Sequence, residues 1–259
     1  MNIPYNIDVY DNLINSGLQS KLWDYVRVQE WHQKWVPAEH AVTRYRPVNG
    51  LDWFVAKGMH MGSSMHRCAL ASDEDSLKEN HMPIYLLWKE LNRSLNNQYT
   101  LTGLPEGMWD KDIEVPIPKD PNLSTGWRAY INASHNTQVI GNGYIHRDSS
   151  LLDREDLVTM LYVVNPEWYP SWGAEVRYYP EDPEGVAGDH QQFNTGNNQQ
   201  KRGFNIGWLD CGRIVSPVPG RLTVYDGRCL HATSASNNND IETPLIKIAF
   251  RAQRISGTK

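Results

Sequence analysis

The chain has few cysteines, and none of them stands at a metal-ligand spacing. Its 259 residues include only Cys68, Cys211 and Cys229, and no CxxC motif occurs. A disulfide framework and a zinc knuckle both need closely spaced cysteines, so neither is expected. Isolated cysteines are typical of reduced thiols, which predicts a cytoplasmic protein.

Long apolar runs and an excess of positive charge are also missing. The longest apolar stretches are too short to cross a bilayer. The start, MNIPYNIDVYDN, has no basic segment followed by an apolar one, so we expect no signal peptide. The formal net charge of −5 argues against general nucleic-acid binding, which needs a basic surface to displace counterions.

The chain does have enough apolar sequence for one domain spanning residues 1–259. Hydrophobic residues make up 40% of it, and neither an internal repeat nor a linker divides it. The aromatic residues are mainly 13 Tyr and 10 Trp, against 4 Phe. Such side chains combine an apolar body with a polar tip, which suits a β-fold with a pocket.

The expected elements run from helices to strands along the chain. Apolar residues recur at helical spacing in residues 8–35, where a short strand comes first, and in residues 83–98. Short strand-like runs separated by turn residues follow at 127–133, 142–146, 157–164, 174–179, 206–209, 221–225 and 245–252. This order predicts an α+β fold, mainly β, with N-terminal helices packed on one face of a rolled sheet.

Two polar segments show no regular period. Residues 58–68 (GMHMGSSMHRC) combine Met and His, but glycines and serines interrupt them, so a loop near the pocket is expected rather than a soft metal site. Residues 183–205 are rich in Gln, Asn and Gly. A surface loop and a mobile lid over a pocket are both compatible with that composition.

The stretch GNGYIHRDSS, residues 141–150, contains a potential metal-binding pair. On a β-strand, His146 and Asp148 would point to the same face. His231 supplies a third candidate ligand, since it follows a strand and a tight turn in GRLTVYDGRCLHAT. Two imidazoles and one carboxylate on one face of a metal leave three positions open, which is typical of non-haem Fe(II) enzymes that bind a cosubstrate and O2.

A cosubstrate such as 2-oxoglutarate would also need a cation for its far carboxylate. In the strand-like run TPLIKIAFRAQR, Leu245, Lys247, Ala249 and Arg251 share one face. A charged residue within an apolar strand is costly unless it has a partner, and a bound carboxylate would be that partner. Lys247 and Arg251 are therefore the two candidates, with Lys247 preferred.

The order of these motifs resembles that of the Fe(II)/2-oxoglutarate-dependent dioxygenase superfamily, in its prolyl 4-hydroxylase-like branch of bacteria and phages. The motifs that carry the resemblance lie in residues 127–253: HRD, LVTMLYVVNPEW, WGAEVRYYPE, PVPGRLTVYDGRCLHAT and IKIAFRAQ. The resemblance implies a double-stranded β-helix (jelly-roll) core over these residues, with residues 1–100 as a helical support region.

The same resemblance implies the roles of the candidate site residues. His146, Asp148 and His231 would hold Fe(II), and Lys247 or Arg251 would bind the far carboxylate of 2-oxoglutarate. Asn132 would lie near its keto-acid end. The family couples oxidative decarboxylation of 2-oxoglutarate by O2 to hydroxylation of an unactivated C–H bond. A carboxylate at position 148 favours hydroxylation over halogenation, because related halogenases carry a small residue there.

Two other readings of the pattern remain open at this stage. A cupin-like metal-binding isomerase or a non-catalytic binding module would bind metal without 2-oxoglutarate, although cupins usually carry more histidines. A protein that kept the fold and lost the chemistry is the third. The substrate of an oxygenase is equally open between a prolyl or other amino-acid residue in a protein and a small metabolite. The sequence predicts no oligomeric state.

Overall fold

The computed structural model describes residues 3, 5–28, 32–33, 65–71, 73–101, 128–134, 148, 155–180, 211–234 and 244–255. Residues 32–33, 65–69 and 134 are described by their backbone alone.

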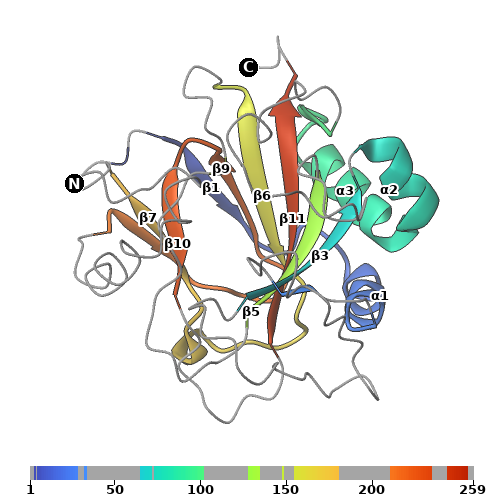
Figure 1. Cartoon of the computed structure of the whole chain (residues 1–259), viewed down its shortest axis with the longest axis horizontal. Coiled ribbons are helices and arrows are strands. Elements are labelled where there is room, and N and C mark those ends of the chain that lie inside the picture. The colour runs from blue at the N-terminus through green and yellow to red at the C-terminus, as the bar shows by residue number, and fades with distance from the viewer. Residues whose placement is uncertain are drawn as a thin grey trace, which may run out of the picture.

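Two antiparallel sheets form the body of the molecule (Figure 1). The larger, eight-stranded sheet has the order β1, β9, β6, β11, β5, β3, β2, and β4 also pairs with β11. Its strands in chain order are β1 Ile7–Tyr10, β2 His32–Gln33, β3 Met65–Ala71, β4 Tyr99–Thr100, β5 Ala129–Ser134, β6 Leu157–Val163, β9 Leu222–Asp226 and β11 Leu245–Arg254. The smaller sheet has the order β10, β7, β8, with bounds Leu230–Thr233, Val176–Tyr179 and Arg213–Val215.

Within the described residues, three α-helices cover one face of the large sheet (Figure 1). They are α1 Ser16–Val26, α2 Glu74–Asn80 and α3 Met82–Ser94, and a short 3-10 helix, η2, spans Pro170–Trp172. The side chain of Asn15 accepts a hydrogen bond from the backbone N–H of Leu18 at 2.9 Å and caps α1. Asp73 caps α2 in the same way through Ser76, at 2.7 Å.

The main hydrophobic core lies between these helices and the large sheet. Alternate residues of β11, namely Ile246, Ile248 and Phe250, point into it and are fully buried. Trp88 of α3 packs on Phe250 with 5.4 Å between ring centroids. One face of β11 therefore contributes to stability, which leaves the other face available for a site.

The opposite face of the large sheet packs against the small sheet. Leu161, Tyr225 and Ala249 of the large sheet form a second buried cluster with Val176 and Tyr178 of the small one. Lys247 and Arg251 alternate with the apolar residues of β11, so they share the face of Ala249. The space between the two sheets therefore contains both packed apolar side chains and charged side chains.

Most expected elements lie close to their predicted positions. The helix expected at residues 83–98 is α3, and the strand and helix expected within 8–35 are β1 and α1. The mainly β architecture with helices on one sheet is confirmed. The strands expected at 142–146 and 206–209, and the 183–205 segment, lie outside the described residues. In the described part, no helix has the length and apolarity needed to span a bilayer.

The expected loop at residues 58–68 is wrong at its C-terminal end. Met65–Ala71 forms β3, which pairs with β5. Pairing with β5 satisfies the backbone of β3, and this tertiary contact outweighs the lack of an alternating pattern. Residues 1–100 therefore contribute strands to the large sheet as well as helices.

Candidate functional site

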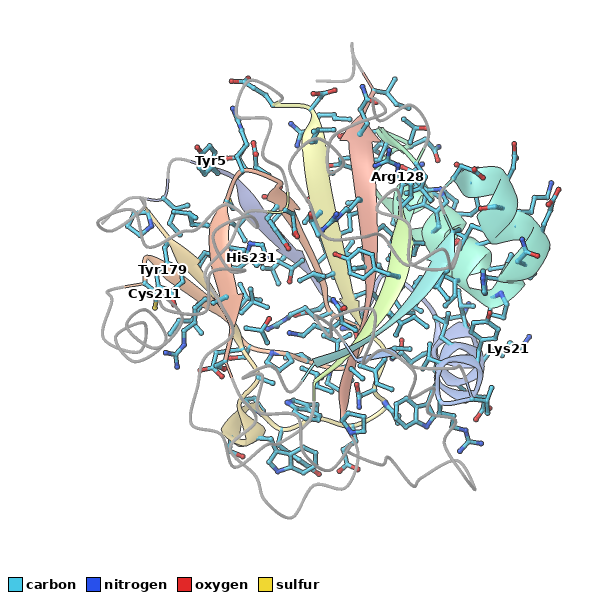
Figure 2. All side chains as sticks on the ribbon, viewed as in Figure 1. Tyr5, Lys21, Arg128, Tyr179, Cys211 and His231 are labelled. Carbon is cyan, nitrogen blue, oxygen red and sulfur yellow. The ribbon has the colours of Figure 1, made fainter. Side chains whose placement is uncertain are left out.

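Asp148 and His231 meet in the space between the two sheets. Asp148 Oδ2 lies 3.6 Å from His231 Nε2, and both side chains are almost fully buried. Figure 2 shows His231 on β10, on the side of that strand toward the large sheet. A carboxylate oxygen and an imidazole nitrogen at this separation can share one cation between them, and both are ligands that Fe(II) accepts.

The backbone fixes which nitrogen of His231 is available. His231 Nδ1 lies 3.0 Å from the carbonyl oxygen of Cys229, which can only accept a hydrogen bond. Nδ1 therefore carries a proton, and Nε2 is the ring nitrogen that faces Asp148 and the Tyr225 hydroxyl. Metal-binding histidines are commonly oriented by such a bond from the other ring nitrogen.

Two side chains hold the Asp148 carboxylate, one on each oxygen. The Tyr225 hydroxyl donates to Oδ2 at 2.6 Å, and the Arg251 guanidinium donates to Oδ1 at 3.2 Å. The Tyr225 hydroxyl is also 3.2 Å from His231 Nε2. Because burial and the Asp148 charge raise the pKa of Tyr225 well above its usual value, the phenol stays protonated and can donate.

The Arg251 side chain is 14% exposed and lies among groups that stabilise its charge. Its guanidinium carbon is 5.4 Å from the ring centre of Tyr130, a cation–π contact. Burial lowers the pKa of Arg251, but Tyr130 and Asp148 outweigh burial and raise it above the ordinary value. Arg251 thus remains a cation with a carboxylate already bound to it.

Lys247 is the second buried cation of this face, and its surroundings differ. The residue is 5% exposed, and its Nζ donates to the backbone carbonyl of Ala174 at 3.2 Å. Burial lowers the pKa of Lys247 to about 8, and the nearby Glu175 carboxylate only partly offsets this. Glu175 itself forms an ion pair with Arg177 at 2.9 Å. An ammonium group has three donors, so Lys247 has capacity for an additional acceptor.

The register of the large sheet separates the two cations. Arg251 and Tyr225 lie in one row across the sheet, because both pair with Thr159 of β6. Lys247 lies in a different row, which includes its partner Asn132 of β5. The two cations are four residues apart on one strand, a rise of about 13 Å between their Cα atoms. Arg251 therefore belongs to the Asp148–His231 end of the face, and Lys247 to the other end.

A buried phenol beside Asp148 and His231 adds further polarity. Tyr178 pairs with His231, and its ring centre is 5.2 Å from that of Tyr225. Within the described residues its hydroxyl finds no hydrogen-bond partner. Burial is the main cause that raises the pKa of Tyr178 far above the usual value, so its hydroxyl is neutral. A buried hydroxyl of this kind needs a partner, which a bound molecule can provide.

Of the six residues singled out in the sequence, the structure describes five and brings three of them together. Asp148, His231 and Arg251 form one cluster, and Lys247 and Asn132 lie further along the same face. His146 lies outside the described residues. Within the described parts of the chain, no three His, Cys, Asp or Glu side chains gather as a metal site.

Tyr225 was not among the residues predicted for this site. The signal available was its position on the inner face of a predicted strand, six residues before His231. Tyr162 of β6 belongs instead to the helix-facing core, and its hydroxyl donates to Gln19. A shift of one residue along a strand decides between these two faces.

Known structures share this fold. The chain is similar to the non-haem α-ketoglutarate-dependent carbocyclase SnoK from nogalamycin biosynthesis, with a TM-score of 0.50 and 9% identity over 96% of this chain and 80% of that one. A prolyl-4-hydroxylase from Pseudomonas putida gives a TM-score of 0.46 and 11% identity over 97% of this chain and 94% of that one. HygX from Streptomyces hygroscopicus, with nickel and 2-oxoglutarate bound, gives 0.48 and 11% over 97% and 84%.

These comparisons define a class of fold. The chain has the fold of the α-ketoglutarate-dependent carbocyclase, so the resemblance expected from the sequence is confirmed at the level of the fold. No family model matches the chain, and no curated protein matches it either.

Proposed function

We propose that the protein is a non-haem Fe(II) oxygenase that couples oxidative decarboxylation of 2-oxoglutarate to hydroxylation of an unactivated C–H bond. The observation that carries the proposal is the buried Asp148–His231 pair, in which the bond from His231 Nδ1 to Cys229 orients Nε2 toward the carboxylate. In this proposal the two facing sheets are parts of a jelly-roll core.

His146, Asp148 and His231 would hold the iron. The donor chemistry of the two described residues fits Fe(II), since one is a neutral imidazole nitrogen and the other a carboxylate oxygen. When bound, Fe(II) would supply the O2 chemistry that no amino-acid side chain provides. The protein's own part is to orient these ligands and to keep water away from them, which the burial of both side chains favours.

Lys247 is the residue that we propose binds the far carboxylate of 2-oxoglutarate. Its amine is buried and has donor capacity beyond its bond to Ala174. Arg251 is less suitable, because it already binds the Asp148 carboxylate and so lies at the metal end of the face.

Asn132 takes a different role in this proposal from the one expected from the sequence. It pairs directly with Lys247, and paired residues of an antiparallel sheet point to the same side. We therefore assign Asn132 to the far carboxylate rather than to the keto-acid end. Its amide can donate a hydrogen bond there.

The substrate class proposed is a molecule with an aliphatic C–H bond, either a prolyl or other amino-acid residue of a protein or a small metabolite. The Asp148 carboxylate supports hydroxylation, because the resemblance found in the sequence implies a small residue at this position in related halogenases. C–H cleavage at such a centre needs no side-chain general base, and the described face provides buried phenols and cations rather than an exposed base.

The direct test is consumption of the cosubstrate. We expect Fe(II)-dependent release of labelled CO2 from carboxyl-labelled 2-oxoglutarate, with succinate formed in equal amount. Asp148→Ala should abolish this turnover while its circular dichroism spectrum stays that of the wild type. Turnover retained in Asp148→Ala would remove Asp148 from the ligand set. Metal binding by the wild type without 2-oxoglutarate consumption would favour the cupin-like alternative.

A further inference from the structure

Tyr225 has an unusual position relative to the two candidate ligand atoms. Its hydroxyl is 2.6 Å from Asp148 Oδ2 and 3.2 Å from His231 Nε2, the two atoms that face each other across 3.6 Å. The residue is 1% exposed, and its strand pairs on both sides, with β1 and β6. The phenol is therefore held rigidly against both atoms.

The single proton of the phenol can serve only one of these contacts. His231 Nδ1 donates to the carbonyl of Cys229, so the ring nitrogen that the phenol meets is Nε2, at 3.2 Å. A carboxylate is a strong acceptor, and the distance to Asp148 Oδ2 is the shorter one. The proton of the phenol therefore lies on the Asp148 side.

Arg251 completes the hold on the carboxylate. It donates to Oδ1, while Tyr225 donates to Oδ2. With a donor on each oxygen, the plane of the carboxylate is fixed, and Oδ2 faces His231 Nε2. Both donors come from the same row of the large sheet, so the hold does not depend on a surface loop.

We propose that Tyr225 is a positioning residue of the metal centre, whose hydroxyl works with Arg251 to hold Asp148 Oδ2 toward His231 Nε2 before a metal ion binds. This rests on the proposed function, because it assumes that Asp148 and His231 are ligands. Tyr225 does not bind the metal. A carboxylate oxygen has two lone pairs, so Oδ2 can accept from Tyr225 and bind a cation at once.

The alternative is that Tyr225 competes with the metal for its ligands. Competition would require the phenol to give up a hydrogen bond when the metal arrives. The bond to Oδ2 can persist, and the longer contact with Nε2 does not use the proton of the phenol, so little is lost. Preorganisation of Asp148 therefore outweighs competition, and removal of the hydroxyl should weaken metal binding.

The test is titration of the metal-free, full-length protein with Mn(II) by calorimetry, in the absence of O2 and 2-oxoglutarate. Tyr225→Phe, which removes one oxygen atom, should weaken Mn(II) binding by about 10- to 100-fold. The control is Tyr179→Phe. Tyr179 is also buried but neighbours Tyr178 on β7, so its ring points to the opposite side of the small sheet, away from His231 in Figure 2. The affinity of Tyr179→Phe for Mn(II) should equal that of the wild type.

Two results would overturn the proposal. One is unchanged or tighter Mn(II) binding in Tyr225→Phe, which would make the hydroxyl a bystander or a competitor. The other is a visible phenolate-to-Fe(III) charge-transfer band in the ferric wild type that disappears in Tyr225→Phe, which would make Tyr225 a ligand. A wild type that binds no Mn(II) would instead refute the proposed function, so the two failures are distinguishable.

Discussion

Burial of the charged Lys247 amine lowers the stability of the ligand-free protein. Burial lowers its pKa from 10.5 to about 8, so the charged form is disfavoured by about 3 kcal/mol at neutral pH. In water the same amine would be fully hydrated. The position is therefore better explained by binding of an anion than by the stability of the fold.

We expect Lys247→Met to raise the free energy of unfolding by about 3 kcal/mol at pH 7 when no ligand is present. Between pH 8 and 10.5 only the unfolded wild type keeps the lysine proton. Wild-type stability should therefore rise with pH across that window, and this rise should be absent from Lys247→Met. Urea denaturation at a series of pH values measures both effects. A destabilised Lys247→Met would mean that the amine is satisfied within the fold.

Substitutions of Lys247 and of Arg251 should weaken the binding of two different ligands. At saturating Mn(II), Lys247→Met should bind 2-oxoglutarate about 10- to 100-fold more weakly, because a charge-assisted hydrogen bond is lost. Arg251→Met should weaken Mn(II) binding by a similar factor through the loss of its bond to Asp148. Once Mn(II) is saturating, the affinity of Arg251→Met for 2-oxoglutarate should be close to that of the wild type. Calorimetry with each ligand in turn separates the two, and the reverse pattern would make Arg251 the carboxylate-binding residue.

At the scale of elements, Asn165 connects β6 to β11. Its side-chain amide donates to the carbonyl of Pro244 at 2.9 Å and accepts from the N–H of Ile246 at 2.7 Å. Asn165 is 1% exposed, so no water replaces these bonds. The connection fixes the start of the strand that carries Lys247.

Asn165→Ala should lower the free energy of unfolding by about 2–4 kcal/mol, because two buried backbone groups lose their partners. Asn80→Ala, which removes an exposed amide from the end of α2, is the matched control and should change stability by less than about 0.5 kcal/mol. Chemical denaturation of the three proteins gives the comparison. Equal stability of the two variants would show that the link between β6 and β11 is not needed.

The sequence predicted the elements whose patterns are local. β11 was predictable because it is a largely apolar run that follows turn residues, and α3 because its apolar residues recur at helical spacing. β3 was not, because only its pairing with β5 makes it a strand. Asp148 and His231 were singled out by their motifs, and the structure brings their side chains together. Tyr225 was not singled out, since its role comes from contacts with residues 77 and 6 positions away.

At the scale of the whole molecule, the large sheet has two different faces. The helices bury one face in an apolar core, while the other carries Arg251, Lys247 and Asn132 toward the small sheet. The rigid, helix-covered sheet can thus hold charged groups at fixed positions along β11. The apolar core on one face can thus offset the free-energy cost of holding charged groups on the other face.

The central claim is that Asp148, His231 and Lys247 together bind Fe(II) and 2-oxoglutarate. The most direct measurement is the visible spectrum of the anaerobic protein after addition of Fe(II) and then 2-oxoglutarate. We expect the metal-to-ligand charge-transfer band of a chelated keto acid in the wild type, its loss in Asp148→Asn, and a higher 2-oxoglutarate requirement in Lys247→Met. A folded, Fe(II)-loaded wild type that shows no band at saturating 2-oxoglutarate would contradict the proposal that these residues bind Fe(II) and 2-oxoglutarate.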